Sequence, residues 1–457
     1  MKLSLTKHLG KDDLVAWNEL SSISHTQFLT DVMQLANKLP DKKFAINLCE
    51  ERYSFMVAFA AVIVKQQTNL LPQSRVIENI YKVAEDYPNN YCIIETFIDG
   101  LEIEQLEIDY SLAGDTRLEN QDAQELSNIA TPSIDSEHTA AIAFTSGSTG
   151  KPQANSKTWG ALVSGAAIAA ERFGFIANPV HIVATVPPQH MYGLESSILY
   201  SLQNGCPIYA GRPFYPDDIR CAVASAQQPV ILVTTPVHLR ACAAALSLKW
   251  SNIKYVISAT APLRIELARQ VSSNMNTKVM EIFGCTEVGA IATREPLKSE
   301  IWQLYSGLRI YKQNNKTLIH AEHIVQDIEL NDRIEIVDEQ HFNLIGRDSD
   351  MVNIAGKRGS LTDLTLKLQS VDGVEDAVVY LPDSDNEVNR LTAFVVTKEL
   401  DEKKISTELA KKIDRVFIPR PIYRVEKLPY NATGKLTQKT LQQMHLSCKQ
   451  NQKMNSK

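Results

Sequence analysis

A glycine-rich segment, residues 144–153, carries the residue types best suited to holding a phosphate group. It reads Phe-Thr-Ser-Gly-Ser-Thr-Gly-Lys-Pro-Gln, with hydroxyl groups and one lysine between two apolar stretches. Gly147 and Gly150 can adopt positive φ, which lets successive backbone N–H groups turn toward one point. The predicted polyanion site consists of Thr145, Ser146, Gly147, Ser148, Thr149, Gly150 and Lys151.

The spacing within this loop excludes an ordinary Walker loop. Two residues separate its glycines where a Walker loop has four, and Lys151 is followed by Pro152 instead of a serine or threonine. The apolar run 139–144 predicts a strand before the loop, and residues 155–173 predict a helix after it. A flexible surface linker is the alternative, but linkers seldom join a tight apolar strand to a helix.

Residues 281–289, Glu-Ile-Phe-Gly-Cys-Thr-Glu-Val-Gly, form the second segment suited to chemistry. A strand is expected to end at Phe283, after which Gly284 turns the chain and presents Thr286 and Glu287 at the strand's carboxyl edge. A carboxylate at this place could hold Mg²⁺ against phosphate oxygens, as a metal ligand rather than a base. Taken alone, the Thr-Glu pair could instead cap the start of a helix.

Three further segments add polar side chains that could face a ligand. The rigid turn after a Pro-Pro pair bears His190, which could orient a carboxylate or be a structural histidine. Asp332 and Arg347 bracket two strand-like runs and could bind sugar or phosphate oxygens, although in isolation both are ordinary surface charges. Lys435 follows a glycine in a turn, where it could neutralise crowded phosphate and carboxylate oxygens or stay solvated.

The composition is typical of a soluble globular protein. The 457 residues are too many for one compact core, and a net charge of −6 provides no basic field for nucleic acid. The 7 cysteines are scattered without metal-site spacing, which favours a reducing cytosol and argues against structural zinc. The first ten residues lack a signal-peptide core, and the most apolar stretch, 56–64, is too short to span a bilayer. We therefore expect a cytoplasmic protein with a buried helix at 56–64 and no membrane or nucleic-acid partner.

The order of strand-like and helix-like runs predicts two domains. Alternation over residues 1–348, with nearly continuous apolar strands, predicts a large α/β body of several subdomains with mainly parallel sheets. Short strands and helices over residues 349–457 predict a small α+β C-terminal domain. The polar residues 449–457 are expected to be frayed.

Taken in order, these segments resemble the adenylate-forming superfamily of acyl-CoA synthetases, aryl-acid ligases, luciferases and peptide-synthetase adenylation domains. Residues 145–152 match its phosphate loop, 283–287 its aromatic-Gly-x-Thr-Glu motif, 346–350 its hinge turn and 429–435 its C-terminal lysine motif. The resemblance covers most of the chain, from about 44 to 441. It implies ATP and Mg²⁺ as cofactors and a two-step reaction. A carboxylic acid attacks the α-phosphate to give an acyl-adenylate, and the thiol of CoA or of a phosphopantetheinyl carrier protein then displaces AMP.

The resemblance also implies a role for each matching residue. Lys435, Thr286 and His190 are the implied catalytic residues, with Lys435 serving adenylate formation. Besides the phosphate loop, the implied ATP contacts are Ala259, Thr260, Ala261, Phe283, Gly284, Asp332 and Arg347, with Phe283 stacking on adenine and the last two binding ribose. Glu287 is the implied Mg²⁺ ligand. The mobile small domain is expected to swing about Ser349 or Asp350.

Departures from the family pattern bear on the hinge and the substrate. Gln153 and Ser349 stand where many relatives carry other residues, and the second change leaves the hinge open between Ser349 and Asp350. Residues 193–198 lack the Phe-Asp pair of amino-acid-activating relatives, which favours an aromatic acid such as a hydroxybenzoate or cinnamate. A fatty acyl-CoA synthetase and a nucleotide-binding protein without turnover are the alternatives, and a monomer and a homodimer are both compatible with the sequence.

Overall fold

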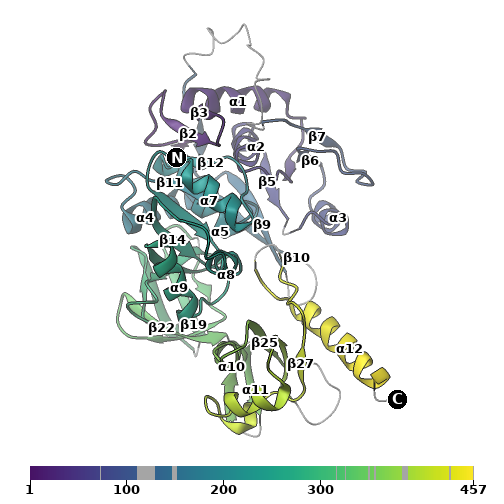
Figure 1. Cartoon of the computed structure of the whole chain (residues 1–457). Helices are drawn as coiled ribbons and strands as arrows, with labels where there is room; N and C mark the ends of the chain where they lie inside the picture. Colours follow the sequence, from purple (N-terminus) through teal and green to yellow (C-terminus); the bar gives the residue numbers. More distant parts are fainter. Residues whose placement is uncertain are drawn as a thin grey trace. The chain divides into compact units, whose positions relative to one another are not determined.

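The computed structural model describes residues 1–72, 74–110, 129–146, 152–314, 316–324, 326–347, 350–354, 357–382, 390–431 and 434–455. These form two compact units, the larger made of Met1–Arg309 and His320–Ile328, the smaller of Ile310–Ile319 and Glu329–Lys457 (Figure 1). The larger unit contains sheets covered by helices, and the smaller unit mixes short strands and helices. The predicted mixed α/β architecture, with a large body and a smaller C-terminal part, is confirmed.

The first sheet of the larger unit is mainly parallel and ends in a hairpin. Its strand order is β10-β9-β5-β4-β6-β7. The bounds are β4 (Phe44–Asn47), β5 (Thr68–Leu71), β6 (Asn90–Ile94), β7 (Gln105–Glu107), β9 (Thr139–Ser146) and β10 (Pro152–Thr158). All pairs are parallel except β9–β10, which is antiparallel with Ser146 opposite Pro152. The ends of the segment 147–151 are therefore fixed next to each other by the ladder.

The helix expected to begin at Asn155 starts later, so the predicted strand-loop-helix layout is wrong in its last part. Residues 152–158 continue as β10, and α4 (Trp159–Phe173) begins after Thr158, whose hydroxyl accepts a hydrogen bond of 3.2 Å from the Ala161 N–H. The pairing with β9 explains the difference, because a long-range ladder outweighs local helix preference. The predicted loop residues Gly147, Ser148, Thr149, Gly150 and Lys151 lie outside the described residues.

The second sheet of the larger unit has a parallel centre. Within this unit its order is β17-β16-β15-β14-β13-β11-β12-β2-β3. The bounds are β2 (Leu14–Trp17), β3 (Ser22–Ser24), β11 (His181–Ala184), β12 (Ile208–Tyr209), β13 (Val230–Thr234), β14 (Ile253–Ser258), β15 (Lys278–Cys285), β16 (Gly289–Arg294) and β17 (Trp302–Leu304). The strands from β2 to β15 pair in parallel, whereas β3, β16 and β17 are antiparallel to their neighbours.

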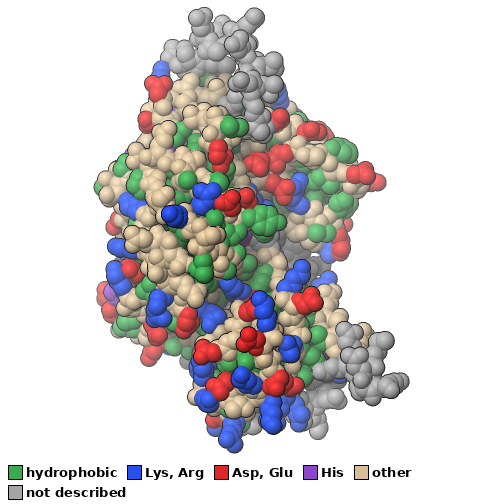
Figure 2. Space-filling view, viewed as in Figure 1, with side chains coloured by type: hydrophobic (Ala, Val, Ile, Leu, Met, Phe, Trp, Pro, Cys, Tyr) green, Lys and Arg blue, Asp and Glu red, His purple; other side chains and the backbone are tan. Residues whose placement is uncertain are grey.

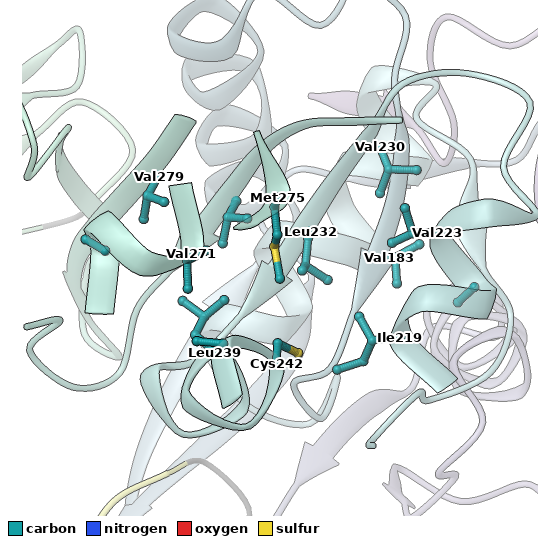
Figure 3. Close-up of a cluster of buried hydrophobic side chains, with 14 of the residues drawn as sticks. Val183, Ile219, Val223, Val230, Leu232, Leu239, Cys242, Val271, Met275 and Val279 are labelled. Atoms are coloured by element: carbon teal, nitrogen blue, oxygen red, sulfur yellow. The ribbon is translucent and has the colours of Figure 1, made fainter. Parts of the chain in front are cut away.

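Helices cover this sheet and close its hydrophobic core. Figure 3 shows side chains of α7 (Pro216–Ala224), α8 (Pro236–Ala244) and α9 (Ile265–Met275) meeting those of the central strands, with Leu232 and Leu239 among the fully buried ones. The remaining elements of the unit are β1 (Lys2–Ser4), α1 (His25–Lys38), α3 (Ile77–Asp86), β8 (Ser133–Asp135), α5 (Met191–Gly193), the π-helix η2 (Leu194–Leu199) and α6 (Tyr200–Asn204).

Helix α2 (Arg52–Val64) lies between the two sheets. It contacts β4 and β5 of the first sheet and β12 of the second, and almost all of its side chains are buried. A helix that is apolar on all sides is suited only to such a place. The buried helix expected at 56–64 is therefore confirmed, and it begins four residues earlier than expected.

The smaller unit contains two hairpins, a three-stranded sheet and three helices among its described residues. The hairpins are β21 (Asp332–Ile336) with β22 (His341–Arg347), and β23 (Met351–Ile354) with β24 (Lys357–Ser360). The other elements are α10 (Leu361–Gln369), β25 (Asp376–Tyr380), β26 (Thr392–Val396), α11 (Glu402–Leu409), the 3₁₀ turn η4 (Arg415–Phe417), β27 (Ile422–Arg424) and α12 (Gln438–Asn455). The strands β18 (Leu308–Gln313), β19 (Lys316–Ala321) and β20 (Ile328–Glu329) form a small sheet where the chain passes between the units.

The C-terminal segment is more regular than the sequence suggested. Residues 449–455 continue α12, so the expectation that 449–457 is frayed is wrong for most of the segment. Its lysine, glutamine and methionine residues have good helix propensity, and the helix is anchored at its start by Leu441, which packs with Tyr423 and Leu428.

Within the described ranges, no helix has both the length and the hydropathy needed to cross a bilayer. On the face shown in Figure 2, acidic and basic side chains are interspersed over the surface. This mixture agrees with the modest net charge of −6.

A buried histidine makes the stability of the larger unit sensitive to acid. His181 is 4% exposed, its ring centroid lies 4.5 Å from that of Trp17, and its Nδ1 has no hydrogen-bond partner. Desolvation lowers the pKa of His181 to about 4. In the unfolded chain the ring titrates near 6.5, so its contribution is complete above that pH and is lost as the pH falls toward 4.

We therefore expect His181→Leu to flatten the fall in thermal stability between pH 6.5 and 4. The wild-type protein should lose up to about 3 kcal/mol through this group over that range. The measurement is the midpoint of thermal unfolding against pH for wild type, His181→Leu and the control His8→Asn, which changes an exposed histidine. Parallel curves for all three proteins would contradict the assignment.

Candidate active site

Three neighbouring strands of the second sheet run parallel toward the same edge. Thr234 at the end of β13 pairs with Ser258 at the end of β14, and Ser258 pairs with Glu281 of β15. The segments that follow these strands therefore leave from one edge of the sheet. This carboxyl edge is where α/β proteins bind ligands.

The segment after β14 contains the three predicted nucleotide contacts Ala259, Thr260 and Ala261. Thr260 has φ 77°, an uncommon conformation for a β-branched residue and one that costs about 1–3 kcal/mol. The segment is held by Glu281, which accepts hydrogen bonds from the Leu263 N–H at 3.1 Å and from Arg294 Nε at 2.7 Å. Strain of this kind is concentrated at ligand sites, which supports a binding role for the segment.

The predicted Thr286–Glu287 pair lies in the turn between β15 and β16, not at the start of a helix. Both residues are partly exposed, and β16 begins at Gly289 directly after the turn. The helix-cap alternative is therefore wrong. The two strands approach closely here, because a Cβ on Gly284 would lie 2.4 Å from the Gly289 carbonyl oxygen.

Phe283 occupies the last buried position before this turn. Its side chain is 8% exposed, and its ring centroid lies 5.8 Å from that of Trp302 at an interplanar angle of 58°. Gly284, which follows it, is exposed. The predicted adenine contact would therefore use the remaining exposed part of the Phe283 ring together with the open backbone at Gly284.

The segment that bears His190 is tied to the same sheet edge by Tyr192. The Tyr192 hydroxyl donates to the Ile257 carbonyl oxygen at 2.9 Å and lies 3.3 Å from that of Thr234. His190 is partly exposed at the N-terminus of α5, and its carbonyl oxygen accepts from the Leu194 N–H at 2.8 Å. The structure thus brings His190 to the edge that carries the Ala259–Ala261 segment.

Arg52 supports this segment and was not identified from the sequence. Its guanidinium is fully buried and donates to the carbonyl oxygens of Ala184 and Val186 at 2.8 and 2.7 Å, and to the Ser197 hydroxyl at 2.8 Å. Burial lowers the pKa of Arg52 to about 9. The only sequence signal was an arginine opening an otherwise apolar helix.

Lys157 connects the phosphate-loop hairpin to the Thr286–Glu287 turn. It lies on β10, its side chain is 6% exposed, and its Nζ donates to the Glu287 carbonyl oxygen at 2.6 Å. Thr145 is on the paired strand β9, opposite Gln153, and Ser146 is the last residue of that strand. The hairpin that bears the predicted loop and the turn that bears Glu287 are therefore in direct contact.

The donor chemistry of the turn fits Mg²⁺ shared with a nucleotide. Mg²⁺ is usually held by one or two carboxylates together with waters and substrate phosphates, and Glu287 supplies one partly exposed carboxylate. Over the ranges that the structure describes, His, Cys, Asp and Glu side chains form no group of three or more that could hold a metal ion. The turn suits a metal that needs phosphate oxygens to complete its coordination.

In the smaller unit, the backbone brings Asp332 and Arg347 together. Asp332 begins β21, Arg347 ends β22, and the two are direct partners in the antiparallel register. The Asp332 side chain is 8% exposed. The predicted pair thus stands at one end of a single hairpin.

Lys435 is presented by a closed turn of the same unit. Asn431 donates its N–H to the Lys435 carbonyl oxygen at 3.0 Å, and its side-chain oxygen accepts from the Lys435 N–H at 2.8 Å. Gly434 has φ 73°, which favours glycine, and the Lys435 side chain is exposed.

Of the two hinge candidates, Asp350 accepts from the Thr362 hydroxyl at 2.8 Å, and Ser349 lies outside the described residues.

The sequence is similar to those of known enzymes over most of its length. The family model for AMP-binding enzymes matches residues 11–316, and the model for the AMP-binding enzyme C-terminal domain matches residues 367–435. A 4-coumarate–CoA ligase from Halorhodospira halophila is 26% identical over 322 residues, 66% of this chain and 76% of the relative. A 3,4-dihydroxybenzoate–[aryl-carrier protein] ligase from Bacillus anthracis is 21% identical over 318 residues, 67% of this chain and 74% of the relative.

The architecture is also found in solved structures. The o-succinylbenzoate CoA synthetase from Bacillus subtilis, in complex with its acyl-adenylate intermediate, superposes with a TM-score of 0.80 at 15% identity, covering 96% of this chain and 98% of that one. The shared architecture is a mixed α/β fold with a large body and a smaller C-terminal domain. The chain belongs to the AMP-binding enzyme family, and the predicted membership of the adenylate-forming superfamily is confirmed.

Proposed function

We propose that the protein is an AMP-forming acid–thiol ligase. With ATP and Mg²⁺ it converts a carboxylic acid to an acyl-adenylate with release of pyrophosphate. It then transfers the acyl group to the thiol of CoA or of a phosphopantetheinyl carrier protein, with release of AMP. The observation that carries the proposal is the contact of Lys157 Nζ with the Glu287 carbonyl oxygen, which joins the phosphate-loop hairpin to the carboxylate-bearing turn.

Each candidate residue has a proposed role in this reaction. The loop from Thr145 to Lys151 holds the phosphates, and the segment Ala259–Ala261 with Phe283 and Gly284 holds the adenine. Asp332 and Arg347 bind the ribose, and Thr286 and His190 face the reacting carboxylate. Glu287 would hold Mg²⁺, which supplies positive charge to the phosphate oxygens. Lys435 provides charge where carboxylate and α-phosphate meet.

The proposed substrate is an aromatic acid such as a hydroxybenzoate or a cinnamate. Residues 193–198 carry no Phe-Asp pair for a substrate amine. The relatives named above act on coumarate, dihydroxybenzoate and succinylbenzoate, with CoA as the acceptor in two cases and an aryl carrier protein in the third. A fatty acid is the second candidate substrate. The proposed thiol acceptor is either CoA or a carrier protein.

We propose a catalytic body of residues 1–348 and a small mobile domain of residues 349–457, which pivots at Ser349 or Asp350. The compact units divide earlier, because residues from Glu329 onward cluster with the smaller unit. In this proposal the hairpin of Asp332 and Arg347 nevertheless belongs to the body. Such a pivot would let Lys435 serve the first step and leave for the second. The protein is proposed to act in the cytoplasm as a monomer or a homodimer.

An acid panel tests this function. The protein, ATP and Mg²⁺ are incubated with benzoic, cinnamic and fatty acids in the presence of hydroxylamine, which traps adenylates as hydroxamates. We expect kcat/KM for the best aromatic acid to exceed that for the best fatty acid by at least about 10-fold, a difference of about 1.4 kcal/mol. CoA and a carrier protein that bears a free phosphopantetheine thiol are then compared as acceptors.

The control reaction omits ATP. Higher rates with fatty acids would shift the assignment to a fatty acyl-CoA synthetase. ATP binding without hydroxamate from any acid would instead favour a nucleotide-binding protein without turnover.

A further inference from the structure

The Thr286–Glu287 turn is held from two sides by side chains that the proposed reaction does not use. The first is Lys157, whose ammonium group is buried and donates to the backbone carbonyl of Glu287 at 2.6 Å. The two residues are separated by 130 positions in the chain. Lys157 therefore fixes the backbone of the turn without occupying the Glu287 carboxylate.

Glu195 contacts the other end of the turn. One of its carboxylate oxygens accepts from the Ala290 N–H at 3.1 Å. The other lies so close to Gly289 that a Cβ at that position would be 2.1 Å from it. Gly289 also has φ 101°, so both its backbone conformation and the lack of space for a side chain suit glycine.

Lys157 and Glu195 each stabilise the charged form of the other. Desolvation raises the pKa of Glu195 to about 7, and the positive charge of Lys157 acts against this rise. Burial lowers the pKa of Lys157, and Glu195 is the first among the groups that oppose this change. A buried ammonium group is costly without such compensation. The pair is thus matched in charge as well as placed against a single turn.

Lys157 and Glu195 lie on two elements that belong to the proposed site. Lys157 belongs to β10, the strand that follows the predicted phosphate loop, and Glu195 belongs to the π-helix η2 just after His190. Single turns of π-helix are frequent at functional sites. Three parts of the site, the loop hairpin, the His190 segment and the Glu287 turn, therefore meet at this pair.

We propose that Lys157 and Glu195 are positioning residues that fix the Thr286–Glu287 turn relative to the phosphate-loop hairpin, so that the Glu287 carboxylate is held where a metal-bound phosphate can reach it. The proposal rests on the proposed use of Mg²⁺ and ATP. It adds two residues that act through the backbone of the turn rather than by touching substrate.

The test uses the full chain and two readouts. Lys157→Met removes the donor and keeps most of the side-chain length, whereas Lys157→Arg keeps a donor and the charge. The control is Lys278→Met, at the exposed start of β15, the strand that leads into the turn. The first readout is hydrogen–deuterium exchange of the backbone amides of residues 286–290 without nucleotide. The second is the Kd for ATP, measured by calorimetry with Mg²⁺ and with EDTA.

In Lys157→Met we expect about 10-fold faster exchange at residues 286–290 and about 10-fold weaker ATP binding in Mg²⁺, with little change in EDTA. Lys157→Arg should restore part of both effects, and Lys278→Met should match wild type. If Lys157→Met does not fold, Glu195→Gln decides, because the glutamine oxygen can still accept from Ala290 while the charge is lost. This variant is expected to show the same two changes to a smaller degree.

Unchanged exchange at the turn would overturn the proposal, as would an equal loss of ATP affinity with and without Mg²⁺, which would indicate a general effect on the phosphate loop. Unfolding of both variants would overturn it as well, because local positioning requires an intact body. Failure of the proposed function is a separate result, since in that case wild type itself would not bind ATP.

Discussion

Lys435→Ala is expected to slow adenylate formation by about 100- to 1,000-fold, the usual effect of removing one preorganised donor from a developing charge. The Asn431-centred turn explains why the effect should be specific. Its hydrogen bonds join the backbones of Asn431, Gly434 and Lys435 and the side chain of Asn431, so truncating the exposed lysine side chain leaves all of them in place.

Two half-reactions, measured separately, check this result. Pyrophosphate release with acid and ATP reports the first step, and thioester formation from a supplied acyl-adenylate and thiol reports the second. The second rate should stay within about threefold of wild type if Lys435 acts only where carboxylate and α-phosphate meet. Lys439→Ala, four positions along at the exposed start of α12, is the matched control. Equal losses in both steps would contradict the proposed role of Lys435.

Arg52→Met is expected to destabilise the larger unit by about 3 kcal/mol. Methionine fills much of the same volume, but it leaves the buried carbonyl oxygens of Ala184 and Val186 without their donor. Ser197 keeps a partner, because its hydroxyl also donates to the Gly193 carbonyl oxygen at 2.6 Å. The loss is therefore concentrated at the end of β11, directly before the segment that bears His190.

Calorimetry should show this as a lower midpoint of thermal unfolding, by about 5 °C. The control is Arg220→Met, which removes an ion pair with Asp217 on α7 and should leave the midpoint nearly unchanged, because solvent screens exposed ion pairs. An Arg52→Met protein as stable as the control would mean that the cost of burying the guanidinium offsets its three hydrogen bonds. That outcome would remove the structural role assigned to Arg52.

The sequence was most informative where local pattern and long-range structure agree. Nearly continuous apolar strands predicted mainly parallel sheets in the body, and β4, β11, β13, β14 and β15 do have parallel neighbours, because buried parallel strands have no polar face. In the small domain, where short strands and helices were expected, Ser360 caps helix α10 by accepting from the Asp363 N–H at 3.3 Å. The placement of Thr286 and Glu287 at a strand's carboxyl edge followed from the same logic.

The contacts that organise the site could not be predicted in this way. Lys157 meets Glu287 across 130 residues, and Arg52 meets Ser197 across 145. Neither pair has a spacing signal, since each depends on how the two sheets are arranged around α2. The error at residues 155–158 has a different cause, because pairing with β9 within the first sheet decided between helix and strand.

The register of the β9–β10 hairpin also limits how this chain can change in length. Ser146 pairs with Pro152, so five residues connect the two strands. An insertion or deletion that moved β10 by one position would turn every side chain of the strand to the opposite face, and Lys157 would no longer point toward Glu287. Functional descendants of this chain are therefore expected to keep the number of residues between Ser146 and Pro152 constant.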